Sequence, residues 1–350
     1  MSVKPEILVV GTGAVGSTVA GWLAEAGERV TVFDLPPVVE AIRAKGIRLY
    51  LGEGRGTVSE HRVNAVSRLE EAPPPGIIIL TVKTYSLDRV AALVRAAFSD
   101  PPVVLAFQNG VGNQRILPRH FSRVVYGIVG YNAWVDEPGL VGFQKRGPLV
   151  LGTPDGACRG LADESAAVLG RAVETVVAER FHDAVYSKMV INLTNSIQAL
   201  IGHPGRPVGN LSAFQRVLTR LLAEGVEIAR ANGFREVRIG GMPSWRLIRL
   251  SARLPQILTR ATFKRNLRKM VVSSMVQDVL RSGQAGTGGV ESELEDINGE
   301  FIRLADARGL EIPFNRTVYR LCRERFSAAS FEPMSIDEVY RAVEAVSGRR

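Results

Sequence analysis

A glycine-rich loop near the N-terminus, residues 11–16, narrows the possible folds more than any other part of the chain. It follows a β-rich run at residues 6–10 and opens a helical pattern at residues 14–26. In such a loop the first glycine permits a tight turn, the second lets the backbone approach a pyrophosphate, and the third lets the helix pack on the strand. The helix N-terminus adds free N–H donors for phosphate. We therefore predict that a dinucleotide is bound by Gly11, Thr12, Gly13, Ala14, Val15 and Gly16.

Asp34 ends the second strand pattern, residues 29–33, and stands 18 residues after Gly16. Two prolines then open a helical pattern at residues 36–45, which Gly46 ends. A carboxylate at this point can accept hydrogen bonds from the ribose hydroxyls of the dinucleotide, and it repels a 2′-phosphate. The local chemistry therefore favours NAD(H) over NADP(H). The neighbouring cations Arg43, Lys45 and Arg55 would favour NADP(H) instead if they folded over its 2′-phosphate.

Short strand patterns alternate with helical patterns in the N-terminal part of the chain, as they do in βαβ units. The run at residues 77–82 is almost wholly apolar, which is typical of a parallel strand buried on both faces. Residues 47–51 and 62–66 fit a hairpin, and residues 131–152 fit extended segments that return to the sheet edge. From residue 161 onward, long helical patterns dominate.

The length of 350 residues fits two domains. We predict an α/β, Rossmann-like, doubly wound N-terminal domain at residues 1–180. An all-α domain follows at residues 181–350, with a basic insert at residues 235–270. Hydrophobic residues make up 46% and charged residues 23%, which argues against intrinsic disorder. No apolar run approaches the ~20 residues that a membrane-spanning helix needs, so we expect no membrane partner.

The chain contains two cysteines, Cys158 and Cys322, which lie far apart with no CxxC and no nearby histidine pair. This excludes a disulfide scaffold and a cysteine-based zinc site, and we expect no bound metal. The N-terminus carries no extended apolar segment with a cleavage site. Both observations fit a reducing cytoplasm. The net charge of +9 favours anionic partners, such as a dinucleotide or a carboxylate substrate.

Polar side chains follow two of the expected strands, where open α/β sheets bind their ligands. Lys83 comes directly after the apolar run at residues 77–82, and Asn109 follows the strand pattern at residues 103–107. We expect both side chains to face the nicotinamide end of the dinucleotide. Two simpler interpretations stay open: Lys83 begins a helix and reaches solvent, and Asn109-Gly110 is a plain turn.

A polar stripe marks the helical pattern at residues 183–200, where Lys188, Asn192 and Asn195 stand at positions i, i+4 and i+7 of one helix. Apolar residues occupy much of the remaining surface, so the helix is expected to be buried. An unpaired buried ammonium is costly, and a ligand cleft would provide partners for it. A structural hydrogen-bond network between helices is the alternative.

Seen together, the motifs resemble the ketopantoate reductase family (2-dehydropantoate 2-reductases). The resemblance covers almost the whole chain, in family order. It rests on the glycine loop, Val82-Lys83, Gln108-Asn109-Gly110-Val-Gly112, Ser187-Lys188 with Asn192, Ser273-Ser274-Met275-Val-Gln277-Asp278, and Ser292-Glu293-Leu-Glu-Asp-Ile-Asn298-Gly299. It implies a Rossmann domain followed by a helical domain, with the active site between them. It also implies NADPH-dependent reduction of a small 2-oxo acid, ketopantoate, to a 2-hydroxy acid.

The resemblance assigns roles to single positions. Lys188 matches the catalytic general acid, and Glu293 matches the carboxylate that binds the substrate hydroxyl. Lys83 matches a lysine that lines the cofactor cleft, and Asn109 matches an asparagine near both nicotinamide and substrate. The remaining matches to substrate-contacting positions are Asn192 and Ser274, and the polar stripe adds Asn195.

Three departures from the family pattern bear on specificity. Members that use NADPH commonly carry an arginine just after the second strand, where this chain has Asp34-Leu35. The glycine-rich residues 284–289 lengthen the spacing before Glu293. The family's Thr-Glu-Ile-Asp pattern reads Ser292-Glu293-Leu294-Glu295 here. In addition to these departures the chain has the basic insert at residues 235–270, whose amphipathic pattern fits an RNA or membrane-surface contact, a helical pair packed on the domain, a homodimer contact, or a border of the substrate site that steers anionic substrates. The absence of aromatic interleaving argues against nucleic acid as a partner.

Two further functions remain open at this point. One is a 3-hydroxyacid dehydrogenase of the wider Rossmann-plus-helical group, with which the pairing of Lys188 and Asn192 is compatible. The other is a dinucleotide sensor without enzymatic activity. The presence of both Lys188 and Glu293 argues against a sensor, because a sensor needs no proton donor.

Overall fold

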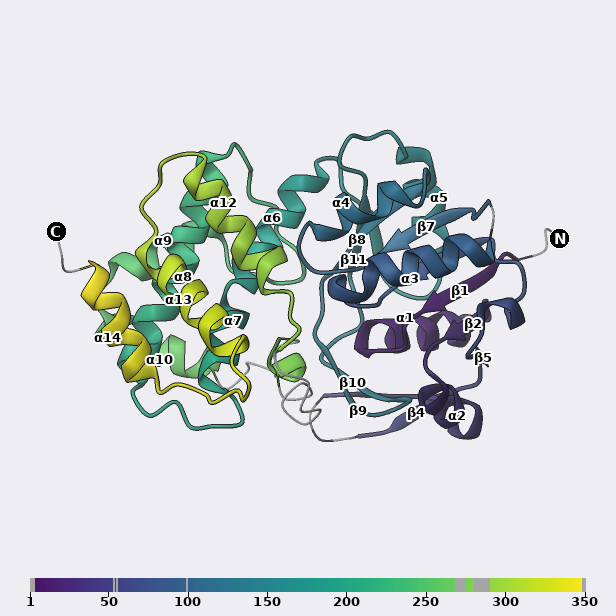
Figure 1. Ribbon diagram of the computed structural model, residues 1–350, viewed down its shortest axis with the longest axis horizontal. Coiled ribbons are helices and arrows are strands. Elements are labelled where there is room, and N and C mark those ends of the chain that lie inside the picture. The colour runs from purple at the N-terminus through teal and green to yellow at the C-terminus, as the bar shows by residue number, and fades with distance from the viewer. Residues whose placement is uncertain are drawn as a thin grey trace. The chain divides into compact units, whose positions relative to one another are not determined.

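The computed structural model describes residues 4–52, 54, 56–98, 100–267, 275–279 and 290–347 (Figure 1). The chain divides into two compact units, residues 1–182 (unit 1) and residues 183–350 (unit 2). Throughout the described ranges, no helix combines the length and the apolar character that crossing a lipid bilayer requires.

Unit 1 is built on a main sheet that comprises, among the described residues, eight strands in the order β12-β11-β8-β7-β6-β1-β2-β5. Neighbouring strands run parallel except β11, which is antiparallel to β8. The bounds are β1 (Glu6–Val10), β2 (Arg29–Phe33), β5 (Asn64–Val66), β6 (Ile77–Leu80), β7 (Val103–Ala106), β8 (Val124–Val129), β11 (Leu149–Gly152) and β12 (Thr175–Val177). The strand order reverses at β1, which confirms the doubly wound α/β prediction and puts the end of β1 at the topological switch point.

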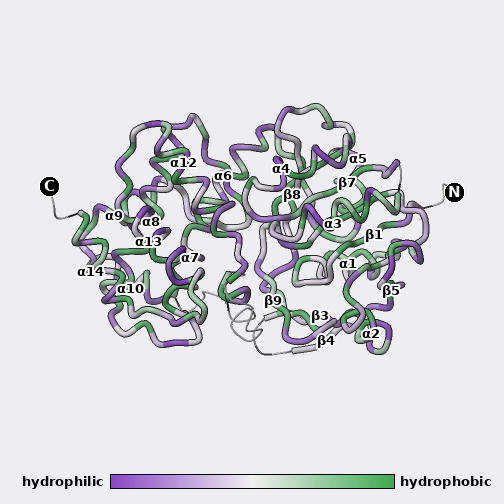
Figure 2. The backbone as a smooth tube through the Cα atoms, in the orientation of Figure 1, coloured by the Kyte–Doolittle hydropathy of each residue, from purple (hydrophilic) through white to green (hydrophobic). Residues whose placement is uncertain are grey.

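Burial explains why the central strands form. All five residues of β1 and all four of β6 are buried, as expected for parallel strands covered on both faces. Figure 2 shows β1 mostly in the green of hydrophobic residues. The helices of this unit are α1 (Ala14–Glu25), α2 (Pro36–Lys45), α3 (Thr84–Ala97), α4 (Gly112–Ile116) and α5 (Arg159–Leu169), with 3₁₀ turns at Leu69–Glu71 and Leu117–Arg119.

A second sheet in unit 1 corrects the predicted hairpin. It has the order β4-β3-β10-β9, with β3 (Ile47–Leu51), β4 (Val58–His61), β9 (Ala133–Glu137) and β10 (Leu140–Phe143). The antiparallel partner of β3 is β4 rather than residues 62–66. Residues 64–66 form β5 and pair with β2 in the main sheet, because Ala65 and Val66 can be buried there. The extended segments expected at residues 131–152 are present, and they supply strands to both sheets.

Unit 2 is helical wherever it has regular structure in the described ranges. Its elements are α6 (Phe181–Asn192, which begins two residues before the boundary), α7 (Thr194–Ile201), α8 (Leu211–Ala231), α9 (Trp245–Arg253), α10 (Gln256–Leu267), a π-helical turn (Glu295–Gly299), α12 (Glu300–Asp306), α13 (Pro313–Phe326) and α14 (Ile336–Ser347). Its core is formed by α7, α8, α13 and α14, with Phe214, Val217, Val318 and Val339 completely buried. This confirms the predicted all-α C-terminal part.

The long helix predicted at residues 183–200 is wrong in one respect: it consists of two helices, α6 and α7, separated at Leu193. Leu193 keeps right-handed helical angles, and its N–H still bonds to the Met189 carbonyl. The Thr194 hydroxyl donates back to the Ile191 carbonyl, which competes with the helical hydrogen-bond ladder at this point. Asn195 therefore lies on a different helix from Lys188.

Candidate functional site

The glycine loop has the close packing that its sequence predicts. Gly11 has a φ of +94°, and its N–H donates to the Phe33 carbonyl at 2.9 Å, which turns the chain sharply after β1. A side-chain carbon at Gly16 would overlap the Gly11 carbonyl oxygen and would lie 2.6 Å from Thr81 Oγ1. Only glycine therefore allows α1 to begin this close to the end of the sheet.

Gly13 differs from its two neighbours because it faces open space. A side-chain carbon built on it would meet no protein atom within 4 Å, and its φ of −66° is open to any residue. Gly13 is also the N-cap of α1, whose first turn presents N–H groups without helical partners. Open space over free N–H donors is the fit expected for a pyrophosphate.

Asp34 is held against the same loop. One of its oxygens, Oδ2, accepts hydrogen bonds from the Thr12 N–H at 2.5 Å and from the Thr12 hydroxyl at 2.6 Å. The other, Oδ1, accepts from the Leu35 N–H at 2.7 Å. The structure thus brings the predicted ribose carboxylate and the predicted phosphate loop together and fixes the direction of the carboxylate.

Of the predicted phosphate-binding cations near Asp34, the structure directs Arg43 elsewhere. Arg43 Nε donates to the Ala65 carbonyl at 2.8 Å, and its guanidinium lies 3.7 Å from Glu71. Lys45 is exposed at the end of α2. Arg55 lies outside the described residues, so its predicted role has no structural counterpart here.

Lys83 and Asn109 follow adjacent parallel strands, β6 and β7, at the sheet edge where β1 also ends. Lys83 is the N-cap of α3, and both residues are engaged in interactions. The local geometry is set by Gln108, whose buried Nε2 donates to the Leu80 carbonyl at 2.9 Å and to the Val82 carbonyl at 3.0 Å. Sequence reasoning did not single out Gln108 as a positioning residue, although its place directly after a strand was the available signal.

In unit 2, Lys188 and Glu293 interact electrostatically. Burial lowers the pKa of the Lys188 ammonium from its ordinary 10.5 to about 8, and the Glu293 carboxylate acts in the opposite direction. Glu293 is 3% exposed. These are the two residues that the sequence predicts to be catalytic, and the structure brings them within interaction range of one another.

The predicted substrate-binding residues of unit 2 lie around the break between α6 and α7. Asn192 ends α6 and Asn195 is the second residue of α7, and both are partly buried. Neither side chain hydrogen-bonds to another described residue. These amide groups are therefore able to form hydrogen bonds to a ligand. Ser274 lies outside the described residues.

A π-helical turn follows Glu293 and is locked to the helix break. The Asn298 amide donates to Ser196 Oγ at 3.0 Å, and Ser196 Oγ donates to the Leu193 carbonyl at 2.8 Å. Asn298 is almost completely buried, and its side-chain oxygen has no hydrogen-bond partner in the described part of the chain. Single π turns are frequent at functional sites. Asn298 belongs to one of the motifs that resemble the family, but the sequence pattern assigns no role to Asn298 or to Ser196.

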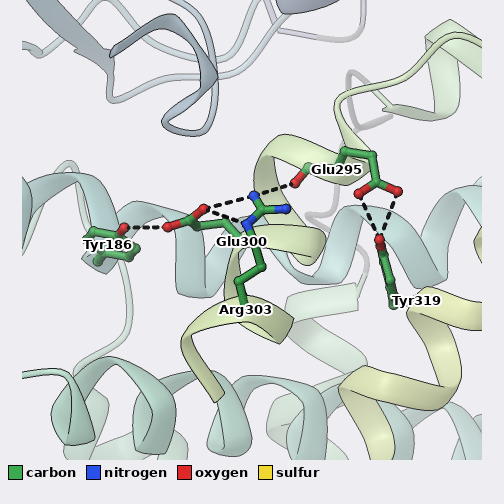
Figure 3. A network of polar contacts seen from close by, with 5 residues as sticks. All are labelled: Tyr186, Glu295, Glu300, Arg303 and Tyr319. Carbon is green, nitrogen blue, oxygen red and sulfur yellow. Dashed lines mark hydrogen bonds and ion pairs between the residues drawn. The ribbon is translucent and has the colours of Figure 1, made fainter. Parts of the chain in front are cut away.

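Polar contacts hold the same turn from its outer side (Figure 3). Tyr186, two residues before Lys188 on α6, donates its hydroxyl to Glu300 at 3.0 Å. Arg303 bonds to the other oxygen of Glu300 at 2.8 Å and to the Glu295 carbonyl at 3.4 Å. Tyr319 of α13 donates to both oxygens of the Glu295 carboxylate, at 2.8 and 2.7 Å. The turn that follows Glu293 is therefore tied to α6 on one side and to α13 on the other.

The doubly wound sheet with its glycine loop and Asp34, together with the helical unit that holds Lys188 and Glu293, is the architecture of a nicotinamide-dinucleotide-dependent oxidoreductase. Residues 7–156 match the family model for the ketopantoate reductase PanE/ApbA, and residues 180–326 match the model for its C-terminal part. The chain belongs to the ketopantoate reductase family. In the described ranges, no group of three or more His, Cys, Asp or Glu side chains could hold a metal ion.

Individual relatives agree with this assignment. The 2-dehydropantoate 2-reductase of Pyrococcus horikoshii is 29% identical over 324 residues, which cover 92% of this chain and 98% of the relative. The PanE/ApbA family ketopantoate reductase from Ralstonia eutropha superposes with a TM-score of 0.69 at 25% identity, covering 96% and 99% of the two chains. A D-mandelate dehydrogenase solved with NADH and anilino(oxo)acetate has a TM-score of 0.71 at 19% identity, covering 91% and 97%. At 19% identity, the similarity to the D-mandelate dehydrogenase shows only that the two chains share a fold.

Proposed function

We propose that the protein reduces 2-dehydropantoate (ketopantoate), or a closely related 2-oxo acid, to the 2-hydroxy acid, with Lys188 as the general acid. The observation that carries the proposal is the buried ammonium of Lys188, which has a pKa of about 8 and interacts with Glu293. Membership of the ketopantoate reductase family and the dinucleotide-binding geometry of the glycine loop support it.

The chemistry is a two-electron reduction that also consumes one proton. A bound, reduced nicotinamide dinucleotide supplies a hydride for the carbonyl carbon. As the C=O double bond becomes single, its electron pair moves to oxygen, and that oxygen takes a proton from the Lys188 ammonium. Lys188 is left as a neutral amine and regains its proton from solvent. The positive charge of the ammonium also stabilises the negative charge that develops on oxygen.

Glu293 keeps the general acid charged. Its carboxylate raises the pKa of Lys188, whereas burial lowers it. At a pKa of about 8, about nine-tenths of the Lys188 side chains are protonated at neutral pH, yet the acid is much stronger than an exposed lysine. We further propose that Glu293 accepts a hydrogen bond from the substrate hydroxyl. Asn192, Asn195, Ser274 and Asn109 are the proposed donors to the substrate carboxylate and carbonyl.

For the cofactor, we propose that NADH is preferred over NADPH, although NADPH is what the resemblance to the family implied. Asp34 is fixed beside the phosphate loop by Thr12, and Arg43 is directed toward Ala65 and Glu71. A 2′-phosphate near Asp34 would meet the Asp34 carboxylate, and of the described cations Arg43 is engaged elsewhere. Two like charges about 4 Å apart cost between ~1 and ~4 kcal/mol, so we expect NADH to bind at least about fivefold more tightly.

Two measurements test these roles. Oxidation of NADH and of NADPH is followed against a panel of 2-oxo acids that includes ketopantoate, with Lys188→Ala and the exposed Lys264→Ala as a matched control. We expect Lys188→Ala to lose about 100-fold or more in kcat and Lys264→Ala to lose none. Turnover of Lys188→Ala at the wild-type rate would refute the general-acid role.

The cofactor proposal is tested with Asp34→Asn against Glu40→Gln, an exposed acid on α2. We expect Asp34→Asn to lower KM for NADPH and to leave kcat with NADPH nearly unchanged, because it removes repulsion and not chemistry. Glu40→Gln should change neither. A wild-type enzyme that prefers NADPH would overturn the assignment of Asp34.

A further inference from the structure

The positive charge of this protein is concentrated in one segment. Residues 235–269 contain ten Lys and Arg and a single acid, Glu236, which leaves a net charge of +9. That is also the net charge of the whole 350-residue chain, so acids and bases balance in all the rest. An excess this local creates a positively charged surface rather than a diffuse field.

In the described ranges the segment forms α9 and α10, here called the basic helix pair (residues 245–267). Its inner side is firmly packed on α8. Trp245 and Ile248 of α9 are buried, and Phe263 of α10 packs edge-on against Phe214 with ring centroids 5.9 Å apart. Gln215 of α8 also donates to Thr259 Oγ1 at 2.7 Å. This agrees with one alternative left open by the sequence, a helical pair packed on the domain.

The outer side of the basic helix pair exposes large aliphatic side chains among arginines. Their exposed fractions are 82% for Ile257, 68% for Leu258, 58% for Leu247 and 47% for Leu250. Ile257 and Leu258 lie in the first turn of α10, after the break between α9 and α10, and stand between the exposed Arg253 and Arg260. Four of the exposed large hydrophobic residues thus fall within a stretch of twelve positions, whereas single exposed aliphatic residues are normal elsewhere.

Within the described part of the chain, acidic side chains do not neutralise the cations of the pair. Among the described residues, no ion pair involves Arg246, Arg249, Arg253, Arg260, Lys264 or Arg265. A second copy of the chain cannot neutralise them in a symmetric contact of this face with itself, because two positive surfaces would meet. The partner that covers this face must therefore be anionic.

We propose that the basic helix pair docks the protein on an anionic lipid bilayer surface. Ile257 and Leu258 enter the boundary between headgroups and acyl chains, while the flanking arginines contact lipid phosphates. A bilayer suits this face better than nucleic acid does, because the pair exposes no aromatic side chain for stacking on bases: Trp245 is buried and Phe263 packs on Phe214. A bilayer suits the face better than an acidic protein does, because Ile257 and Leu258 are 82% and 68% exposed, as side chains that enter the headgroup boundary must be.

This docking needs no membrane-spanning segment, so it revises the expectation of no membrane partner, which rested on the lack of such a segment. An amphipathic helix lies in the plane of the interface and binds through its buried apolar area and its charge. Each arginine near an anionic surface strengthens binding about fivefold, and each inserted aliphatic side chain about tenfold or more.

The experiment measures sedimentation of the full-length protein with vesicles of phosphatidylcholine alone and of phosphatidylcholine mixed equally with phosphatidylglycerol. We expect binding to the mixed vesicles only, weakened by added salt. Ile257→Ser with Leu258→Ser should reduce binding about 100-fold, and Arg253→Gln with Arg260→Gln about 25-fold. Arg253→Lys with Arg260→Lys should retain it, because the charge is kept.

Leu93→Ser is the matched control, since Leu93 is an exposed aliphatic residue near arginines on α3 of unit 1. We expect it to bind vesicles like the wild type. All variants should keep wild-type turnover in solution, which shows that they are folded. Equal binding to both vesicle types, or no binding, would overturn the proposal. So would binding to a random-sequence RNA without binding to vesicles, or a dimer that Ile257→Ser with Leu258→Ser converts to a monomer.

Discussion

Replacing Gly16 with alanine tests the close contact between the start of α1 and the end of β6. The new methyl carbon would lie 2.6 Å from Thr81 Oγ1 and would overlap the Gly11 carbonyl oxygen. Thr81 cannot easily rotate away, because its hydroxyl donates to the Gly11 carbonyl at 2.5 Å and to the Val10 carbonyl at 3.1 Å. The backbone must therefore move. Overpacking of this kind costs about 1–3 kcal/mol, and Tm falls about 2–4 °C for each kcal/mol in a domain of this size.

Gly13→Ala is the control, and it should give the opposite result. Its methyl carbon meets no protein atom within 4 Å, and alanine adopts the backbone angles of Gly13 without strain. The free energy of unfolding should stay the same or rise by up to about 1 kcal/mol, because alanine restricts the unfolded chain. The methyl group nevertheless occupies the space expected for the pyrophosphate, so Kd for the dinucleotide should rise about tenfold or more.

The assays are thermal unfolding without ligand and quenching of tryptophan fluorescence by the dinucleotide. Gly16→Ala should lower Tm by about 2–12 °C. Gly13→Ala should instead raise Kd for the dinucleotide about tenfold or more, with a Tm that stays the same or rises slightly. A Gly16→Ala variant with wild-type Tm would refute the packing argument. A Gly13→Ala variant that binds the dinucleotide like the wild type would remove the phosphate site from this loop.

Three more predictions concern unit 2. In the proposed mechanism ketone reduction needs the Lys188 ammonium, so kcat/KM should fall as pH rises through about 8. Glu293→Gln should shift that fall to lower pH, because it removes the carboxylate that raises the Lys188 pKa, and a shift to higher pH would contradict the pairing. Asn298→Ala should move the same pH profile, because Asn298 ties the turn after Glu293 to Ser196, whereas Ser327→Ala on the exposed end of α13 should not. Burial raises the pKa of Glu224 from 4.5 to about 7, so the protonated carboxyl favours the folded state. The free energy of unfolding should therefore decline by up to about 3 kcal/mol between pH 4.5 and 7 through this group, and urea titrations of Glu224→Gln should lack that decline.

The parts of the fold that sequence predicted well are those in which local pattern and burial agree. The strands at residues 6–10 and 29–33 have the predicted bounds because they are short β-rich runs ended by a glycine or an acid. The helix Pro36–Lys45 also has the predicted bounds, because proline begins the helix and Gly46, at a φ of +68°, ends it.

The errors arose where tertiary contacts override a weak local signal. The strand Val58–His61 is mostly exposed and polar, so nothing in its pattern marks it, and it forms by pairing with β3. The break at Leu193 involves no glycine or proline, and Leu193 keeps helical angles. Neither feature can be read from periodicity, because both depend on what the segment packs against.

The residues of the candidate site also fall into two groups, those that the sequence could predict and those that it could not. The glycines, Asp34 and Lys188 could be singled out from their sequence context, whereas Glu293 was distinguished from the neighbouring acids only by the resemblance to the family. Gln108, Ser196 and Asn298 could not, since their importance lies in buried hydrogen bonds to carbonyls and to one another. A buried amide is visible in sequence only as a polar residue in an apolar stretch.

The pKa of Lys188 explains why burial and a carboxylate are combined at one position. A lysine at its ordinary pKa of 10.5 is fully charged at neutral pH but is a weak acid for a developing alkoxide. Burial alone would strengthen the acid until the side chain lost its proton and, with it, the charge that stabilises the oxygen. Glu293 opposes that loss, and the π-helical turn that follows it in the chain is bonded to the helix break through Asn298 and Ser196. A pKa of about 8 is the outcome in which the group is both mostly charged and readily deprotonated, and this is what the proposed general-acid role of Lys188 requires.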